Sequence, residues 1–125
     1  MQGQGILYWN RAAEQLYGYG RDEVRGRTTH ELLKTELVGG VTRLENNLAR
    51  FGIWAGELQH TTRGGGKVDV EGRLAVMSQH NGRWLVLEVN RDITDRKVAE
   101  AARLSMEQQL AELQSLRIAP HESKR

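Results

Sequence analysis

Apolar positions near the start of the chain predict a short strand followed by a helix. Residues 5–9 form an apolar, aromatic run that is typical of a strand. Asn10 follows it as a predicted helix N-cap, since its side-chain oxygen can accept a hydrogen bond from a backbone N–H of the next turn. Apolar residues then recur at helical spacing over 12–17, and Gly18 favours a left-handed helix stop.

The next part of the chain predicts three further helical segments. Two are short, at residues 21–24 and 28–33. A glycine pair at 39–40 separates them from a longer amphipathic helix over 41–51. The apolar stripe of that helix follows the spacing of one helix face and consists of Val41, Leu44, Leu48 and Phe51.

From residue 53 the hydrophobic period changes to two, which indicates strands. Three strands are predicted, over residues 54–61, 68–76 and 84–90. The glycine cluster 64–66 forms the first turn, and His80-Asn81-Gly82 contains an Asn-Gly pair that favours a tight hairpin. Three strands joined by two short turns predict an antiparallel meander.

The last predicted strand has two unequal faces. One face is wholly apolar and consists of Leu85, Leu87 and Val89. The other is mixed and consists of Trp84, Val86, Glu88 and Asn90. Alternation by itself leaves open which of the two faces the core.

A continuous helix is predicted after the sheet, over residues 96–117, because this stretch has no Gly or Pro, and Pro120 ends it. Five residues at spacings of three and four form a short seam of coiled-coil type, interrupted by Gln109: Ala99, Ala102, Met106, Leu113 and Leu116. The predicted organisation is a domain at 5–94, an exit helix at 95–118 and a polar tail at 119–125.

Composition narrows the function classes. The chain has 125 residues, 38% of them hydrophobic, which suffices for one core. It has no cysteine, so disulfides, thiolate nucleophiles and Cys-ligated zinc are excluded. The net charge is +2 with scattered basic residues, which argues against a nucleic-acid partner. No apolar run approaches the ~20 residues of a membrane span, and no signal-peptide pattern opens the chain, so we expect a cytoplasmic protein without membrane contact.

The chain from Ile6 to Lys97 resembles a bacterial PAS domain. Four segments resemble motifs of that family, in the family's order: Tyr8–Tyr19, Glu23–Gly26, Trp54–Glu57 and Asp92–Lys97. The resemblance implies an α+β fold, with a PAS-like antiparallel sheet, short helices on one face and a long C-terminal amphipathic helix.

One feature departs from the PAS pattern. PAS domains normally begin with an additional strand at the centre of the sheet, and only four residues precede Gly5. An incomplete sheet leaves an unpaired edge, which is a site for pairing with another molecule. We therefore predict a homodimer in which a partner segment or the exit helix covers the gap.

The resemblance also directs attention to cofactors, and none is identified. The flavin photoadduct of the LOV subgroup is excluded by the lack of cysteine. Haem is disfavoured, because its axial histidine usually lies on the helix corresponding to 41–51, which has none. His60 is expected to be a hydrogen-bonded core histidine, whereas His30 and His80 are expected to be exposed or to cap turns.

The PAS pattern places a candidate ligand pocket between the sheet and the helix at 41–51. The residues predicted to line it are Leu48, Trp54, Leu58, His60, Val70, Leu74, Glu88 and Asn90. The polar side chains of Glu88 and Asn90 would face an otherwise aliphatic cavity. They would therefore favour a small polar ligand. The alternative is that both satisfy core backbone groups or line a solvated edge.

These features predict a sensory module that has no catalytic chemistry of its own, since neither an activated nucleophile nor a recognisable carboxylate pair is present. A signalling hinge is expected at Asp92, Ile93 and Thr94, between the sheet and the exit helix. The output domain would belong to a histidine kinase, a cyclic-dinucleotide enzyme or a similar signalling protein. The alternative function is a ligand-free PAS module for dimerisation or protein interaction.

Overall fold

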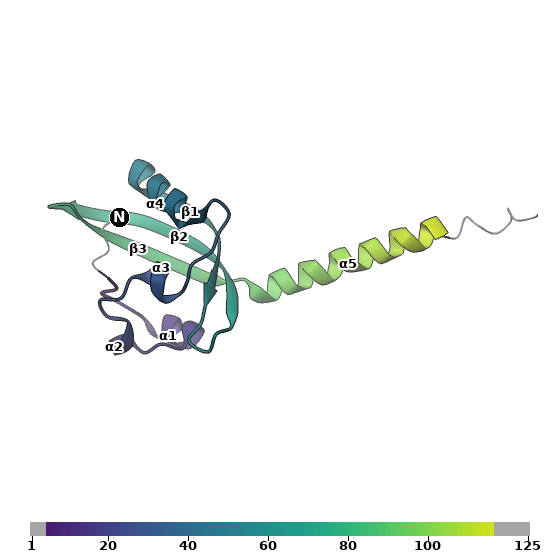
Figure 1. Cartoon of the computed structure of the whole chain (residues 1–125), viewed down its shortest axis with the longest axis horizontal. Coiled ribbons are helices and arrows are strands. Elements are labelled where there is room, and N and C mark those ends of the chain that lie inside the picture. Colours follow the sequence, from purple (N-terminus) through teal and green to yellow (C-terminus); the bar gives the residue numbers. More distant parts are fainter. Residues whose placement is uncertain (1–4, 117–125) are drawn as a thin grey trace, which may run out of the picture. The chain divides into compact units, whose positions relative to one another are not determined.

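The computed structural model describes residues 5–116 of the chain, and side chains as far as residue 114. The chain divides into two compact units, Met1–Ile93 and Thr94–Arg125. Figure 1 shows the elements in chain order, and the second unit contains only the last of them. They are α1 (Arg11–Tyr17), α2 (Arg21–Val24), α3 (Thr29–Leu32), α4 (Gly40–Phe51), β1 (Ile53–Thr61), β2 (Lys67–His80), β3 (Arg83–Asp92) and α5 (Thr94–Leu116).

Helix α1 forms where its capping residues predict it. The Asn10 side chain accepts a hydrogen bond from the Ala13 backbone N–H at 2.9 Å. Gly18 ends the helix with φ at 84°, in the left-handed region that glycine adopts without steric cost. Both caps predicted from the sequence are confirmed.

The segment before α1 differs from its prediction, because it is not a regular strand. Ile6 makes one isolated parallel bridge with Arg25. The Ile6 N–H donates to the Arg27 carbonyl at 2.8 Å, and the Gly26 N–H donates to the Ile6 carbonyl at 3.0 Å. A strand needs a neighbour along its length, and within the described residues this segment has one only at Ile6.

The three strands form an antiparallel sheet in the order β1-β2-β3, as the meander pattern predicts. The first hairpin closes through the Thr62 N–H, which donates to the Gly66 carbonyl at 2.8 Å. The second turns at Asn81 and Gly82, both with positive φ, which is the geometry an Asn-Gly pair favours. Strand β2 is longer than predicted and has a register shift between Val76 and Ser78.

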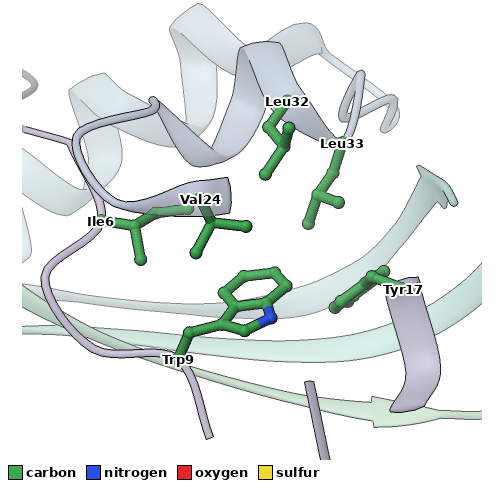
Figure 2. Packing of buried hydrophobic residues seen from close by; sticks show 6 residues of the cluster. All are labelled: Ile6, Trp9, Tyr17, Val24, Leu32 and Leu33. Atoms are coloured by element: carbon green, nitrogen blue, oxygen red, sulfur yellow. The ribbon is translucent and has the colours of Figure 1, made fainter. Parts of the chain in front are cut away.

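Even-numbered residues face the core in β1, in β2 as far as Val76, and in β3 from Trp84 to Asn90. One hydrophobic cluster joins α4 to this face of the sheet. Its buried members are Leu44, Leu48, Leu58, Val70 and Leu74. A second cluster gathers the segment before α1 and the short helices, and it consists of Ile6, Trp9, Tyr17, Val24, Leu32 and Leu33. Figure 2 shows the Trp9 ring facing Val24 and Leu33, with Tyr17 beside them.

The opposite, odd-numbered face of β3 lies outward. Leu85, Leu87 and Val89 are 50%, 51% and 55% exposed. The fully apolar face of this strand therefore points away from the core, while the mixed face with Glu88 and Asn90 points inward. Alternation alone left that choice open, and the family resemblance predicted the inward position of Glu88 and Asn90. The overall architecture confirms the predicted α+β fold of PAS type.

Candidate functional site

A cavity of about 820 Å³ lies in the first unit and is partly open to solvent. One wall is the segment Gly5–Asn10 with α1. The others are residues of α3, residues of β2 from Leu74 to His80, and every residue of β3 from Arg83 to Asn90. Most of the wall is apolar or aromatic, including Trp9 and Trp84. A cavity of this size and character suits a small organic molecule.

A chain of polar side chains joins the cavity wall to the core. The Tyr17 hydroxyl lies 2.8 Å from His60 Nδ1. The Asn90 amide nitrogen donates to the Tyr17 oxygen at 3.2 Å and to Glu88 Oε2 at 3.0 Å. One helix and two strands therefore contribute to one network: α1 supplies Tyr17, β1 supplies His60, and β3 supplies Glu88 and Asn90.

Burial governs the ionisation of this network. Desolvation lowers the pKa of His60 to about 4, with a smaller contribution from the positive charge of His30. Desolvation also raises the pKa of Tyr17 well above its ordinary value, assisted by the negative charge of Glu88. At neutral pH, His60 and Tyr17 are therefore both uncharged.

Glu88 is the acidic group of the network. Desolvation raises the pKa of its carboxyl, opposed by the hydrogen bond from Asn90 and by the positive charge of His30. The residue nevertheless keeps partial solvent access and lines the cavity. Two atoms of this network, His60 Nε2 and Asn90 Oδ1, are buried and have no hydrogen-bond partner within residues 5–114.

His30 differs from its expected role. The sequence predicted a solvated or capping residue, but His30 is partly buried and lines the cavity. Its Nδ1 lies 2.9 Å from the Thr35 hydroxyl. The short helix α3 turns this histidine toward the cavity, because neighbouring Leu32 and Leu33 fill the core. His80 is exposed, as predicted.

The eight predicted pocket residues separate into two groups. Leu74, Glu88 and Asn90 line the cavity. The other five lie elsewhere, in the closed core or against it: Leu48, Trp54, Leu58, His60 and Val70. The cavity therefore lies nearer to α1, α3 and β3 than the family pattern implied, because α4 packs tightly on β1 and β2 and leaves no space there.

His60 is 0% exposed and hydrogen-bonded to Tyr17, which is the core role expected for it. Tyr17 itself was not predicted as a site residue. A signal was available, because a tyrosine on the apolar side of a helix needs a partner for its buried hydroxyl. Its partners, His60 and Asn90, lie 43 and 73 residues away, so spacing could not identify them.

The predicted hinge lies at the junction of the two units. Strand β3 ends at Asp92, and α5 begins at Thr94. Between them Ile93 is buried, and its N–H donates to the Asp69 carbonyl of β2 at 2.8 Å. The last residue of the first unit is thus attached to the sheet by both packing and hydrogen bonding.

The predicted seam residues lie on α5. Ala99, Ala102, Met106 and Leu113 are exposed. Leu116 is in the helix, but its side chain lies outside the described ones. Leu110 is also exposed and follows Met106 by four residues, so it continues the stripe beside Gln109.

The two edges of the sheet differ. The edge of β1 is covered near the end of the strand, where Glu36 and Gln59 exchange two backbone hydrogen bonds of 2.9 and 2.8 Å. The Thr61 N–H also donates to the Leu33 carbonyl at 2.7 Å. The outer edge of β3 pairs with no strand or bridge among residues 5–116. Such an edge is available for pairing with another chain segment.

No helix between residues 5 and 116 has the length and apolar character needed to cross a membrane. The same part of the chain has no group of three or more His, Asp or Glu side chains that could hold a metal ion.

Solved structures resemble the chain in fold, whereas a search of curated proteins found no match. The structure is similar to the PAS domain of a protein from Colwellia psychrerythraea, with 25% identity, a TM-score of 0.60, and 74% of this chain and 80% of that chain covered. It is also similar to the LOV domain of a blue-light activated histidine kinase from Erythrobacter litoralis, with 25% identity, a TM-score of 0.55, and coverage of 68% and 80%.

The LOV domain of the blue-light photoreceptor Aureochrome1, in its dark structure, shares the fold at 20% identity, with a TM-score of 0.61 and coverage of 86% and 76%. In sequence, the chain matches a protein family. The PAS domain family matches residues 1–95, which include the whole sheet and the cavity. The chain therefore belongs to the PAS domain family, whose members are sensory signalling modules.

Proposed function

We propose that this chain is a sensory PAS module that binds a small ligand in its cavity and transmits the signal through α5 to an output domain. The observation that carries the proposal is the cavity itself. It is mostly apolar, and three of its polar side chains, Tyr17, Asn90 and Glu88, are joined by hydrogen bonds. Pockets that bind small molecules combine an apolar wall with a few such polar groups.

The transmission step would use strand β3. Glu88 and Asn90 contact the cavity from this strand, and Asp92, Ile93 and Thr94 follow directly in the chain. A ligand that rearranges Glu88 or Asn90 would act two to four residues before the hinge. It can shift α5 between two states only by the difference in its affinity for them.

The output domain is proposed by analogy. One similar structure is the LOV domain of a blue-light activated histidine kinase, and a kinase of this kind is one candidate for the attached domain. LOV domains in that comparison respond to blue light, but this chain has no cysteine for a flavin photoadduct. We therefore infer a different, noncovalent ligand for this cavity.

A direct experiment is native mass spectrometry with an absorbance scan on protein purified from cells. We expect a mass in excess of the polypeptide, removed by denaturation, from a molecule retained in the cavity. A matched variant, Leu74→Trp, would fill the cavity wall from β2 and should abolish the excess mass. Protein that carries no molecule, and binds none from a metabolite extract, would contradict the ligand-binding proposal.

The second candidate function is a ligand-free module for dimerisation or protein interaction. The exposed apolar face of β3 and the unpaired edge of the same strand favour it. We propose a second copy of this chain as the partner, since both features sit on one strand and each copy offers the same surface. A variant that loses oligomerisation without any change in signal response would favour ligand sensing over this alternative.

A further inference from the structure

At the polar end of the cavity, the side-chain hydrogens of Tyr17 and Asn90 are already used in hydrogen bonds. Asn90 donates one N–H hydrogen to Tyr17 and the other to Glu88 Oε2. Tyr17 has a single hydroxyl hydrogen, and His60 Nδ1 lies 2.8 Å from it as an acceptor in the Nε2–H tautomer. These bonds run from Asn90 in two directions, through Tyr17 to His60 and directly to the carboxyl group of Glu88.

The carboxyl group of Glu88 can accept further hydrogen bonds. A carboxylate can accept about four hydrogen bonds, and among residues 5–114 Glu88 receives one, from Asn90. No Lys or Arg of these residues forms an ion pair with it. Glu88 also lines the cavity, so its free lone pairs are accessible to a ligand.

The remainder of the cavity is suited to an apolar or aromatic body. Tyr8, Trp9 and Trp84 line it together with aliphatic side chains. The one arginine of the wall, Arg83, is exposed at the hairpin end of β3, five residues from Glu88. At ~3.3 Å per residue of strand, a positive group beside Glu88 would lie roughly 16 Å from that arginine along the strand.

From these contacts we infer that the cavity takes an organic cation, with an ammonium or amidinium head on Glu88 and an apolar body between the tryptophans. The inference rests on the proposed ligand-binding function. A cationic head supplies both the N–H donors that this end lacks and the charge that a buried carboxylate requires. A neutral head would leave Glu88 to be neutralised by a proton instead.

Several groups face Glu88 and bear on the pH dependence. Asn90 lies beside it on β3, Tyr17 faces it from α1, and His30 from α3, while His60 of β1 is joined through Tyr17. Burial raises the pKa of Glu88, so a bound cation would displace a proton from part of the population. Binding of the cation therefore strengthens as the pH rises and Glu88 loses its proton.

The test uses three probes with the same body: phenethylammonium, 2-phenylethanol and phenylacetate. Each is titrated into the full chain by calorimetry, with tryptophan fluorescence as a second signal because Trp9 and Trp84 line the cavity. We expect phenethylammonium to bind at least about tenfold more tightly than the alcohol, as a charge-assisted hydrogen bond implies. Phenylacetate should bind most weakly. Calorimetry in two buffers of different ionisation enthalpy should detect proton release with phenethylammonium.

The matched variants are Glu88→Gln and Glu71→Gln. Both remove one carboxylate from the sheet, but Glu71 lies on the outer face and pairs with Arg91 at 2.9 Å. Glu88→Gln should weaken phenethylammonium binding about tenfold and leave the alcohol unchanged, since the lost interaction is a charged hydrogen bond. Glu71→Gln should change neither. Circular dichroism verifies that both variants fold, and the proton-release measurement needs no variant.

Two results would overturn the inference alone: an alcohol or phenylacetate that binds as tightly as phenethylammonium, or unchanged phenethylammonium affinity in Glu88→Gln. Failure of the proposed function has a different signature. In that case no probe of any charge would bind at millimolar concentration, and the purified protein would carry no molecule.

Discussion

At the scale of single residues, the polar network depends on side chains that have little freedom to move. Gly72 of β2 lies opposite Asn90 on the core face, between that residue and β1. A Cβ at this position would lie 2.8 Å from Leu58 Cδ1 and 3.0 Å from Asn90 Oδ1. The absence of a side chain at residue 72 is therefore what lets the Asn90 amide lie against the sheet.

The variant Gly72→Ala tests this packing. The added methyl group must displace a buried leucine or the Asn90 amide, so we expect a loss of about 1–3 kcal/mol in the free energy of unfolding. Chemical denaturation measures it. The control is Gly64→Ala in the first hairpin turn, where a Cβ would meet nothing within 4 Å. Equal stability of the two variants would contradict the packing described.

His60 predicts a pH dependence of stability. Its pKa is about 4 in the folded protein and 6.5 ordinarily, so between these values the unfolded chain binds more protons. Stability is therefore lost as the pH falls from 6.5 toward 4, by on the order of 2–3 kcal/mol from this residue. Glu88 acts oppositely, since its raised pKa costs stability as the pH increases above the ordinary value of 4.5.

Thermal melting between pH 4.5 and 7.5 measures the effect. The variant His60→Gln, whose amide oxygen can still accept from Tyr17, should flatten the acid side of the profile. Glu88→Gln should keep the loss of stability at acid pH and should remove the loss that the Glu88 carboxyl causes as the pH rises. An acid slope that is the same in His60→Gln and in the unchanged chain would assign it to other groups.

At the scale of elements, α5 is a helix without a buried face in its own unit. Its apolar stripe at Ala99, Ala102, Met106, Leu110 and Leu113 lies within about 40° on either side of one line, at 100° per residue. Leu104 lies on the opposite side of the helix. A single helix of this kind is marginal in water, so a stripe on one side favours association with another helix.

Two substitutions of the same kind test the seam. Leu113 and Leu104 are 61% and 52% exposed, so a glutamate at either position disturbs no packing within the described structure. Leu113→Glu should shift the chain toward monomer, because a buried unpaired charge in a helix pair is costly. Leu104→Glu should not. Sedimentation equilibrium measures both, and equal effects would contradict the predicted seam.

At the scale of the whole molecule, the first unit carries an apolar sheet face and an unpaired edge on the same strand. Leu85, Leu87 and Val89 form a contiguous row on β3, and Ala75 pairs with Leu87 across the neighbouring strand. Exposed rows of this kind mark sites of association. The predicted homodimer therefore has a candidate surface that is separate from α5.

Light scattering coupled to size-exclusion chromatography tests this surface. Leu87→Glu places a charge in the centre of the row and should weaken a dimer that uses it, leaving the circular dichroism spectrum unchanged. Val38→Glu, in an exposed loop outside the sheet, is the control. A dimer that survives Leu87→Glu but dissociates with Leu113→Glu would assign association to α5 alone.

Local chemistry determined much of this protein from its sequence. Asn10 and Gly18 mark the two ends of α1. The glycine cluster and Asn81-Gly82 form the turns of the two hairpins, and the hydrophobic period of two predicts the positions of the strands. Such features depend on residues a few positions apart, so a sequence contains them directly.

The family resemblance predicted that Glu88 and Asn90 face inward, but only the tertiary structure decided which residues surround the cavity. Alternation defines two faces, but the choice depends on what the helices cover, and they cover the face with Glu88 and Asn90. The tight packing of Leu48 on Leu58 and Val70 removed those residues from the cavity. The network through Tyr17 joins residues up to 73 positions apart, and contacts at that distance exist only after the chain has folded.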